Sequence, residues 1–595
     1  MNWNQSTKMS LLIHHWLFWL MIITFIGIFL RMLPSLLNAA WGVDFGIYYG
    51  LTNSFIETKE FINFYDGWGS SYQYFPVLYT ITGVVHWITG IEVIQLMPKI
   101  APILGGLTIP IFYFIVKDLI GNKRIAILAS ALLSVSTFHV YQTSHAAPLT
   151  VGHFFMMLSF YFFIKYVKDQ KYIIPLFFST VLLILSHHFT TYFYLISITF
   201  MVFYYTTEKH VRSKHLYHLL FYIGLAATLA FGYWGFIATP VFGFFTKKMF
   251  LPPTVIILLF YAFIFSGVLF IRFWKKQYPN FLQRQFFKNY SKEKTITIMV
   301  LLIGILSIIV SITGLPGVKA SLTPLALILS IPMMFLISFG IAGFSFLKAQ
   351  KGHAFVKGWI IGIFISFLYA IVSGGLFPDR HLEYLIVPLC IPAALTLNEF
   401  IKDYQDSRIK NIFNKYTPSM QTVHRKKKIA LVGSIIVLFI SNMIVAYPTI
   451  DSLEHIDERV SDPCINCLDW MQGNMSNSSV IASDHRILML TWATGFDMPL
   501  GEYNITKTIW TANNSSACFE ELQRLKINHV IIDDIMFEKV INVDDGHYYY
   551  FNNNSYEKFL KPPFELIYRN ATLNNQLVEE HWIEIYKVNY SQFRK

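Results

Sequence analysis

An aspartate follows the first long apolar run of the chain and stands among aromatic residues, in the segment WGVDFGIYY (residues 41–49). A carboxylate beside apolar sequence is costly to keep charged unless another group pairs with it or uses it. Asp44 could take a proton from an acceptor hydroxyl, or hold a divalent cation such as Mg²⁺ or Mn²⁺. The structural alternatives are that Asp44 caps a helix N-terminus or meets Arg31.

A second candidate is the segment FPDRHLEY (residues 377–384), which has an arginine and a histidine at the start of another apolar run. Arg380 and His381 suit a phosphate or pyrophosphate group, because a guanidinium offers paired donors in a plane. Alternatively, Arg380 anchors the chain to ordinary lipid head groups, or pairs with Asp379 or Glu383.

Three histidines lie in short turns between apolar runs: His145, His187 and His188. They could line a site or bind a metal, but histidines in such turns are more often hydrogen-bonded structural groups. Asp66 and Lys319 are further candidates for lining the same site. The identity of a metal, and the need for one, stays open at this point.

Of the four cysteines, Cys390 lies inside an apolar run, and Cys464, Cys467 and Cys518 lie nearer the C-terminus. The C-x-x-C pair alone is a weak metal signal, since structural zinc needs four ligands. In an oxidising compartment, a disulfide from Cys518 to Cys464 or Cys467 is the favoured interpretation.

These candidates are distributed over a chain of 595 residues, of which 54% are hydrophobic and only 14% are charged. Soluble domains carry about 25% charged residues. Apolar runs of about 20 residues recur, and each is long enough to cross a membrane. We expect a polytopic α-helical membrane protein with about 13 spans, near residues 11–32, 98–116, 124–142, 147–166, 172–187, 190–206, 216–238, 253–272, 295–314, 322–347, 354–376, 384–401 and 428–447.

Basic residues gather in alternate loops between these runs. By the positive-inside rule, the loops that carry them face the cytoplasm, so the N-terminus is inside and the C-terminus outside. Basic loops beside an anionic leaflet also explain the net charge of +12 without a nucleic-acid partner. The basic residues on that side include Lys117, Lys123, Arg124, Lys165, Lys168, Lys209, Arg212, Lys214, Arg272, Lys275, Lys276, Arg284, Lys348, Lys351 and Arg425.

This topology requires that the apolar run at 75–91 does not cross the membrane. We expect it to form an interfacial or re-entrant helix within a large first outer loop, residues 33–97. The transmembrane domain then extends over residues 1–450.

Residues 461–595 are expected to form a small extracytoplasmic α/β domain, because short apolar strands at 480–482 and 530–532 alternate with helical stretches such as 518–525. The frequent N-x-S/T acceptors of this region suit a glycosylating compartment, although Asn-rich sequence also generates the motif by chance. They are Asn474, Asn477, Asn504, Asn513, Asn514, Asn553, Asn570 and Asn589.

Together these features resemble the GT-C membrane glycosyltransferases, particularly the catalytic subunit of oligosaccharyltransferase and its archaeal relatives. A carboxylate loop follows the first span, and the segments YFPVL (74–78) and APILGGLTIP (101–110) follow it in the family's order. Arg380 with LIVP (385–388) resembles the arginine that contacts the lipid phosphate in the family. LDWM (468–471) resembles the start of the family's outer domain.

The resemblance implies an inverting transfer. A polyprenyl or dolichyl phosphate would carry the sugar, Asp44 would match the catalytic carboxylate of the first loop, and Arg380 would stabilise the leaving phosphate. The acceptor would be a glycan, a lipid or a protein at the outer membrane face. The localisation implied is an archaeal cell membrane, or the endoplasmic reticulum with a lumenal C-terminal domain if the source is eukaryotic.

Three departures distinguish the chain from oligosaccharyltransferase. Residues 142–150 hold no acidic residue where the metal-binding members of the family have them. SDHR (483–486) stands near where the family's WWDYG signature would fall, and the loop at 314–322 is short. A single-sugar transferase is therefore favoured, and a divalent metal becomes doubtful. The rival interpretations are oligosaccharyltransferase itself, a non-catalytic scaffold, and a lipid or solute transporter.

Overall fold

The computed structural model describes most of the chain, and it divides into two compact units. Unit 1 contains Met1–Arg31, Leu104–Thr143 and Gly152–Pro448, and unit 2 contains Met32–Ile103, Ser144–Val151 and Thr449–Lys595. The described residues are 15–206, 213–277, 301, 304–305, 324–347, 350–413, 433, 439–440, 442–443, 458–497, 507–513, 515–538, 540–544, 547–551, 553–573 and 578–593.

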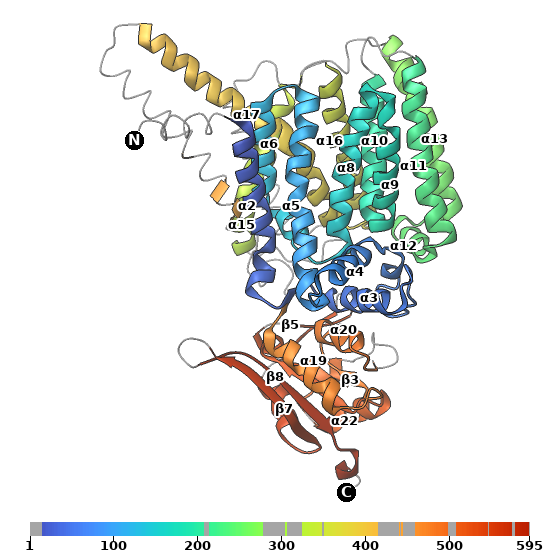
Figure 1. The fold of residues 1–595 in the computed structure, drawn as a ribbon, viewed down its shortest axis with the longest axis vertical. Coiled ribbons are helices and arrows are strands. Elements are labelled where there is room, and N and C mark those ends of the chain that lie inside the picture. Colours follow the sequence, from blue (N-terminus) through green and yellow to red (C-terminus); the bar gives the residue numbers. More distant parts are fainter. Residues whose placement is uncertain are drawn as a thin grey trace. The chain divides into compact units, whose positions relative to one another are not determined.

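Unit 1 is helical (Figure 1). Its helices, some of which continue into unit 2, are α2 (Trp16–Leu37), α5 (Val93–Ile120), α6 (Lys123–Val135), α7 (Thr137–Gln142), α8 (Pro148–Lys168), α9 (Ile173–Ser186), α10 (His188–Thr206), α11 (Ser213–Phe236), α12 (Thr239–Met249), α13 (Pro253–Gln277), α15 (Pro324–Phe344), α16 (Lys351–Ser373) and α17 (Pro378–Phe413).

Seven helices among the described residues are long and apolar enough to cross a membrane. This confirms the expectation of a polytopic helical membrane protein. The seven segments are Trp16–Leu37, Val93–Ile120, Pro148–Lys168, Leu216–Phe236, Pro253–Phe270, Lys351–Ser373 and Arg380–Lys402.

The expected spans differ from the helices at several points. The run at 124–142 is broken at Ser136, whose extended backbone (ψ 116°) separates α6 from α7. The run at 295–314 and most of the run at 428–447 lie outside the described residues. The run at 75–91 forms α4 (Val77–Thr89), whose 13 residues rise about 20 Å and are too short for a hydrocarbon core of about 30 Å.

Small residues let the helices of unit 1 approach closely, as in other membrane proteins. A Cβ on Gly358 of α16 would lie 2.3 Å from the carbonyl oxygen of Phe200 in α10. A Cβ on Gly343 of α15 would lie 1.8 Å from the carbonyl oxygen of Pro392 in α17. These two backbone contacts fix α16, which ends shortly before Arg380, and α17, which contains Arg380 in its first turn.

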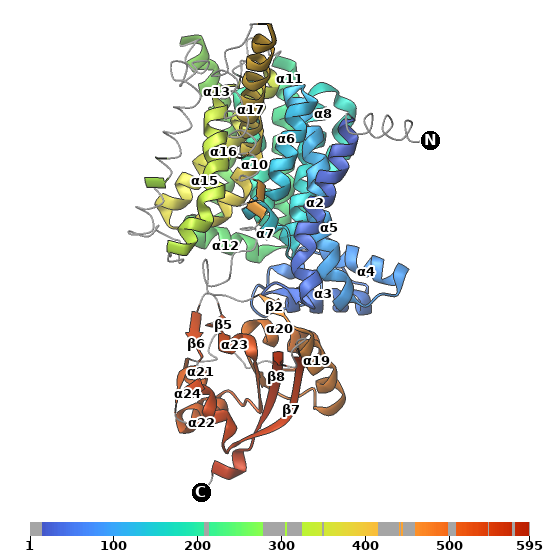
Figure 2. The same cartoon turned by 90° about the vertical axis from the view of Figure 1, so that its left-hand side faces the viewer.

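Unit 2 combines helices with a mixed sheet (Figure 2). The sheet has the strand order β3-β4-β8-β7, in which β3 and β4 are parallel and the other neighbours antiparallel. Its elements are β1 (Ala40–Trp41), α3 (Phe45–Thr58), η1 (Tyr72–Tyr74), α4, β2 (Arg459–Val460), α19 (Asp462–Asn474), β3 (Ile481–Ala482), α20 (His485–Ala493), α21 (Lys507–Thr511), α22 (Ser515–Arg524), β4 (His529–Asp533), α23 (Asp534–Glu538), β5 (Val540–Asp544), β6 (His547–Tyr550), α24 (Asn553–Tyr556), η5 (Glu557–Leu560), β7 (Phe564–Leu573), β8 (Glu579–Val588) and η6 (Tyr590–Phe593).

The strands expected at 480–482 and 530–532 are present as β3 and β4, and the helix expected at 518–525 is α22. The grouping of the first loop differs from the expectation. Residues 32–103 belong to the same compact unit as the C-terminal residues, not to the helical unit. The two segments are joined by a long-range pairing, since β1 forms an antiparallel ladder with β2.

The expected disulfide does not form, because Cys464, Cys467 and Cys518 are all buried free thiols. Cys464 and Cys467 lie one turn apart on the inward face of α19, and Cys518 on α22 lies 3.7 Å from the carbonyl oxygen of Ile509. Burial raises the pKa of Cys464 to about 12 and that of Cys518 to about 11. These cysteines act as small core residues.

Candidate active site

Asp44 stands immediately before α3, and its carboxylate is held by three donors. Its Oδ1 lies 3.1 Å from Nε2 of His485. Its Oδ2 accepts from the hydroxyl of Tyr72 at 3.2 Å and that of Tyr48 at 3.4 Å. The Asp44 side chain is 20% exposed, whereas that of His485 is 4% exposed. The carboxylate is therefore fixed from the protein side while part of it stays accessible.

Neither structural alternative for Asp44 accounts for these contacts. Its side chain makes no capping hydrogen bond to α3. The guanidinium of Arg31 donates to Thr143 Oγ1 at 2.7 Å and to the carbonyl of Gly27 at 2.8 Å, and it lies 2.7 Å from His139 Nδ1.

The short ladder of β1 with β2 brings the first loop to the C-terminal residues. Ala40 pairs with Val460 and Trp41 with Arg459. The ladder is extended by the amide of Gly42, which donates to the carbonyl of Glu458 at 3.0 Å. Gly42 has φ +122°, a conformation that favours glycine, and it turns the chain toward Asp44 two residues later.

Close packing of α3 against α20 aligns the two helices that carry Asp44 and His485 at their N-terminal ends. A Cβ on Gly46 would lie 2.5 Å from the backbone nitrogen of Leu490. One turn further along α3, a Cβ on Gly50 would lie 2.5 Å from the ring of Trp492. The spacing Gly46-x-x-x-Gly50 thus leaves a smooth face on which α20 lies directly.

A buried ionic network fixes the beginning of α20. Asp484 caps the helix, since its Oδ1 accepts from the amide of Ile487 at 3.0 Å. Arg486, two residues after Asp484, donates to Asp533 Oδ2 at 2.8 Å and to Asp484 Oδ2 at 3.1 Å. It also donates to the carbonyl of Arg459 at 2.7 Å. His485 lies between these two anchored residues, so its position is determined by the network.

The tyrosines beside Asp44 are suited to remain donors. Burial raises the pKa of Tyr48 well above its ordinary value, and nearby Tyr72 and Asp44 add to the effect. The rings of Tyr48 and Tyr72 meet edge to face at 5.1 Å. Trp68 meets the ring of His485 edge to face at 5.0 Å. Aromatic rings therefore flank the pair formed by Asp44 and His485.

His145 belongs to the same unit. Its Nε2 lies 2.5 Å from Oε2 of Glu458, and its ring lies 6.2 Å from that of Trp41. A Cβ on Gly42 would lie 3.5 Å from the His145 ring. His145 thus packs against the turn that leads to Asp44, and its partner is a carboxylate of the chain.

The side chains around Asp44 do not fit a divalent cation. Within the described ranges, no group of three or more His, Cys, Asp and Glu side chains could hold a metal ion. Both oxygens of Asp44 face hydrogen-bond donors, namely one imidazole and two phenols. Hard cations such as Mg²⁺ prefer several oxygen ligands with negative charge, and this set of donors does not supply them.

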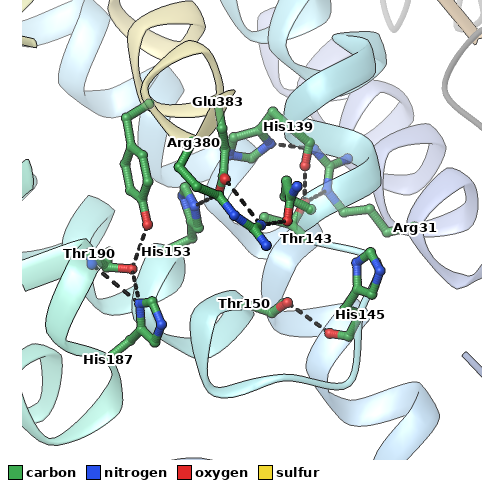
Figure 3. Close-up of polar contacts among 12 residues, drawn as sticks. Arg31, His139, Thr143, His145, Thr150, His153, His187, Thr190, Arg380 and Glu383 are labelled. Atoms are coloured by element: carbon green, nitrogen blue, oxygen red, sulfur yellow. Dashed lines mark hydrogen bonds and ion pairs between the residues drawn. The ribbon is translucent and has the colours of Figure 1, made fainter. Parts of the chain in front are cut away.

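Arg380 lies in unit 1, in the first turn of α17 (Figure 3). It donates to Oε1 of Gln142, and its Nη1 lies 3.9 Å from Oε2 of Glu383. Glu383 is buried and pairs with the buried His153 of α8. The Arg380 side chain is 39% exposed. The arginine is thus braced by an amide and a carboxylate while remaining accessible.

His381 does not share this accessibility. It is fully buried, with Nε2 at 2.8 Å from Ser366 Oγ and Nδ1 at 3.0 Å from the carbonyl oxygen of Phe377. Both ring nitrogens are therefore engaged within the protein. The expected contact of His381 with phosphate does not fit this geometry, and the residue instead attaches the start of α17 to α16.

The other two predicted histidines, His187 and His188, contact side chains of the protein. His187 Nδ1 lies 2.9 Å from Thr190 Oγ1, which lies 2.7 Å from the hydroxyl of Tyr384 (Figure 3). His188 is buried against the rings of Phe244 and Phe245.

Of the two remaining predicted residues, only Asp66 lies within the described part of the chain. Asp66 is exposed in the loop between α3 and η1. Lys319 lies outside the described residues. Conversely, the prediction did not include His485 and Tyr72 as site residues, although the DHR triplet that contains His485 is an unusual concentration of charge at the start of a helix that is otherwise largely apolar.

One family model and several solved structures match the chain. Residues 76–234 match the family model described as dolichyl-phosphate-mannose-protein mannosyltransferase. No curated protein matches the chain.

The structural matches are distant in sequence. An oligosaccharyltransferase from Archaeoglobus fulgidus, tethered with an acceptor peptide that contains an NVT sequon, has a TM-score of 0.55 at 16% identity, covering 87% of this chain and 69% of that one. AglB from the same organism, in complex with an inhibitory peptide and a dolichol-phosphate, gives the same values. ArnT from Cupriavidus metallidurans in the apo state has a TM-score of 0.45 at 12% identity, covering 96% and 98%.

These findings confirm the resemblance to the GT-C membrane glycosyltransferases. The chain is a multi-pass helical membrane protein with their fold.

Proposed function

We propose that the protein is a glycosyltransferase that moves a sugar from a polyprenyl- or dolichyl-phosphate carrier to an acceptor hydroxyl at the outer face of a membrane. The observation that carries this proposal is the Asp44 carboxylate, which three donors hold while it stays 20% exposed. A fixed, accessible carboxylate is what a general base requires.

In the proposed reaction, Asp44 takes the proton of the acceptor hydroxyl, and the hydroxyl oxygen forms a bond to the anomeric carbon of the sugar. The bond between that carbon and the phosphate oxygen breaks, and the lipid phosphate leaves with the electron pair. Attack from the side opposite the phosphate inverts the anomeric configuration. Arg380 is proposed to bind the phosphate, because it is an accessible guanidinium at the start of α17.

The lipid-phosphate donor is supported by the family model over residues 76–234, whose description contains dolichyl-phosphate-mannose. The donor class also agrees with the dolichol-phosphate bound to AglB, a protein with the same fold.

A second candidate is transfer of a glycan to an asparagine, since the TM-score of 0.55 is to an oligosaccharyltransferase with a sequon peptide. Two features of the sequence disfavour it. Residues 142–150 contain no acidic residue, and SDHR (483–486) stands near the expected WWDYG signature. A non-catalytic scaffold or a transporter would leave the arrangement around Asp44 without a role.

We also propose that the C-terminal α/β domain lies outside the cell, or in the lumen of the endoplasmic reticulum. The proposal rests on the gathering of basic residues in alternate loops and on the N-x-S/T acceptors after residue 461. Glycosidase-sensitive mass on Asn474 or Asn570 would support it, and labelling of either residue from the cytoplasm alone would refute it.

The test of the activity is a transfer assay on the full chain in nanodiscs. Polyprenyl-monophosphate sugars would be offered beside the matching diphosphate-linked glycans, with hydroxyl acceptors and sequon peptides as separate arms. Release of lipid monophosphate with a hydroxyl acceptor supports the proposal. Glycosylated sequon peptide from the diphosphate donor would instead establish the oligosaccharyltransferase alternative, and no turnover would favour the scaffold or transporter.

A further inference from the structure

The contact between Asp44 and His485 joins two residues that are 441 positions apart in the chain. Both belong to unit 2. His485 is 4% exposed and Asp44 is 20% exposed, so the imidazole is almost fully covered while part of the aspartate side chain is open to solvent. Of the two side chains, Asp44 is therefore the one that solvent reaches.

The surroundings of the ring restrict its movement. Asp484 and Arg486, the neighbours of His485 in sequence, are fixed by the α20 cap and by the ion pair with Asp533. The edge-to-face contact with Trp68 restricts the ring from the first loop. The direct approach of α3 to α20 at Gly46 sets the separation of the two helices.

The two oxygens of Asp44 have different donors. The phenols of Tyr48 and Tyr72 both donate to Oδ2, and the imidazole alone faces Oδ1. Without the imidazole, the carboxylate could rotate about its χ2 angle, since that torsion is broad for aspartate. The phenols on one oxygen do not define the rotation by themselves.

We propose that His485 is a positioning residue for Asp44, whose Nε2–H donates to Oδ1 and fixes the orientation in which the carboxylate meets the acceptor. The inference rests on the proposed function. The ring acts through Asp44 and does not itself touch the substrate. The reaction then depends on a C-terminal residue to orient a first-loop carboxylate.

The test compares His485→Ala with His485→Gln in the nanodisc transfer assay. The alanine variant is expected to lower kcat about 100-fold, as for a misplacement of about 1 Å, with the KM for the lipid donor unchanged. The glutamine variant is expected to recover kcat at least tenfold over alanine, because its amide Nε2–H can replace that of the imidazole. The matched control is His581→Gln, whose imidazole Nδ1 lies 2.8 Å from Asp534 in the same unit. It should leave kcat within about twofold of wild type, as is typical away from a site.

The outcomes separate this inference from the proposed function. Wild-type turnover by His485→Ala would overturn the positioning role and leave the proposed function standing. Glutamine no better than alanine would also overturn it, because the imidazole would then be needed for more than a hydrogen bond. An equal loss in His581→Gln would attribute the effect to general destabilisation and overturn the inference. Absence of turnover in folded wild-type protein would refute the proposed function and the positioning role with it.

Discussion

The close approach of α3 to α20 at Gly46 makes a quantitative prediction for the substitution Gly46→Ala. The added Cβ would lie 2.5 Å from the backbone nitrogen of Leu490 and 2.8 Å from the carbonyl oxygen of Met489. Because these are backbone atoms, the clash can be relieved only by moving one helix away from the other. Such overpacking costs about 1–3 kcal/mol.

A matched control removes the effect of helix propensity. Replacement of a helical glycine by alanine gains up to about 1 kcal/mol by itself. Gly473 of α19 has no atom within 4 Å of an added Cβ, so Gly473→Ala gains propensity without a clash. At Gly50 the nearest atom is the Trp492 side chain, which can shift more readily than backbone. We therefore expect stability to fall in the order Gly473→Ala, Gly50→Ala, Gly46→Ala.

The assays are thermal melting and turnover of the protein in nanodiscs. A loss of about 1–3 kcal/mol lowers the melting temperature by about 2–12 °C for a unit of this size. Turnover well below melting should also fall, by about 10- to 100-fold, because a shift of about 1 Å between Asp44 and His485 misplaces the carboxylate. If Gly46→Ala has the same melting temperature as Gly473→Ala and keeps wild-type turnover, the packing argument is refuted.

Two further predictions concern the donor and the metal. Arg380→Ala should weaken the apparent affinity for the lipid-phosphate donor by about 1.5–3 kcal/mol, the range for a lost charged hydrogen bond, which is about 10- to 150-fold. The control Lys248→Ala, which removes a cation over the ring of Phe377 at 4.2 Å, should leave the KM for donor unchanged; an unchanged KM in Arg380→Ala would return that arginine to an anchoring role. Treatment with EDTA should leave turnover unchanged, since both oxygens of Asp44 face hydrogen-bond donors. A loss that Mg²⁺ or Mn²⁺ restores would contradict this account of the site.

The sequence predicts the helical membrane class well because length and apolar composition decide whether a segment can cross a bilayer. It predicts the breaks less well. The run at 124–142 is mostly apolar, yet its helix is interrupted at Ser136, and average hydropathy does not predict where a helix breaks. The helix α12 (Thr239–Met249) is not predicted either, because its 11 residues are too few to be recognised as a membrane span.

Part of the candidate site is predictable from the sequence. Asp44 and Arg380 are recognisable from residue type and position, since a charge beside apolar sequence is unusual. Their partners depend on tertiary structure. His485 comes to Asp44 through the β1–β2 ladder and the Gly46 contact, which no local pattern of the sequence encodes.

For the cysteines, the sequence predicts a bond that the structure does not contain. A disulfide was expected from compartment and spacing, but Cys464 and Cys467 both point into the core from α19 and Cys518 is buried on α22. Spacing along the chain does not reveal which way a thiol points.

The central claim is that Asp44 is the base of a sugar transfer, and the most direct measurement is the rate of lipid-phosphate release by Asp44→Asn. The amide keeps the size of the side chain and removes its ability to take a proton. The matched control is Asp469→Asn, an exposed aspartate of α19 in the same unit. We predict that Asp44→Asn abolishes release without changing the melting temperature by more than a few degrees, while Asp469→Asn releases lipid phosphate at the wild-type rate. Release by Asp44→Asn at the rate of Asp469→Asn would contradict the account.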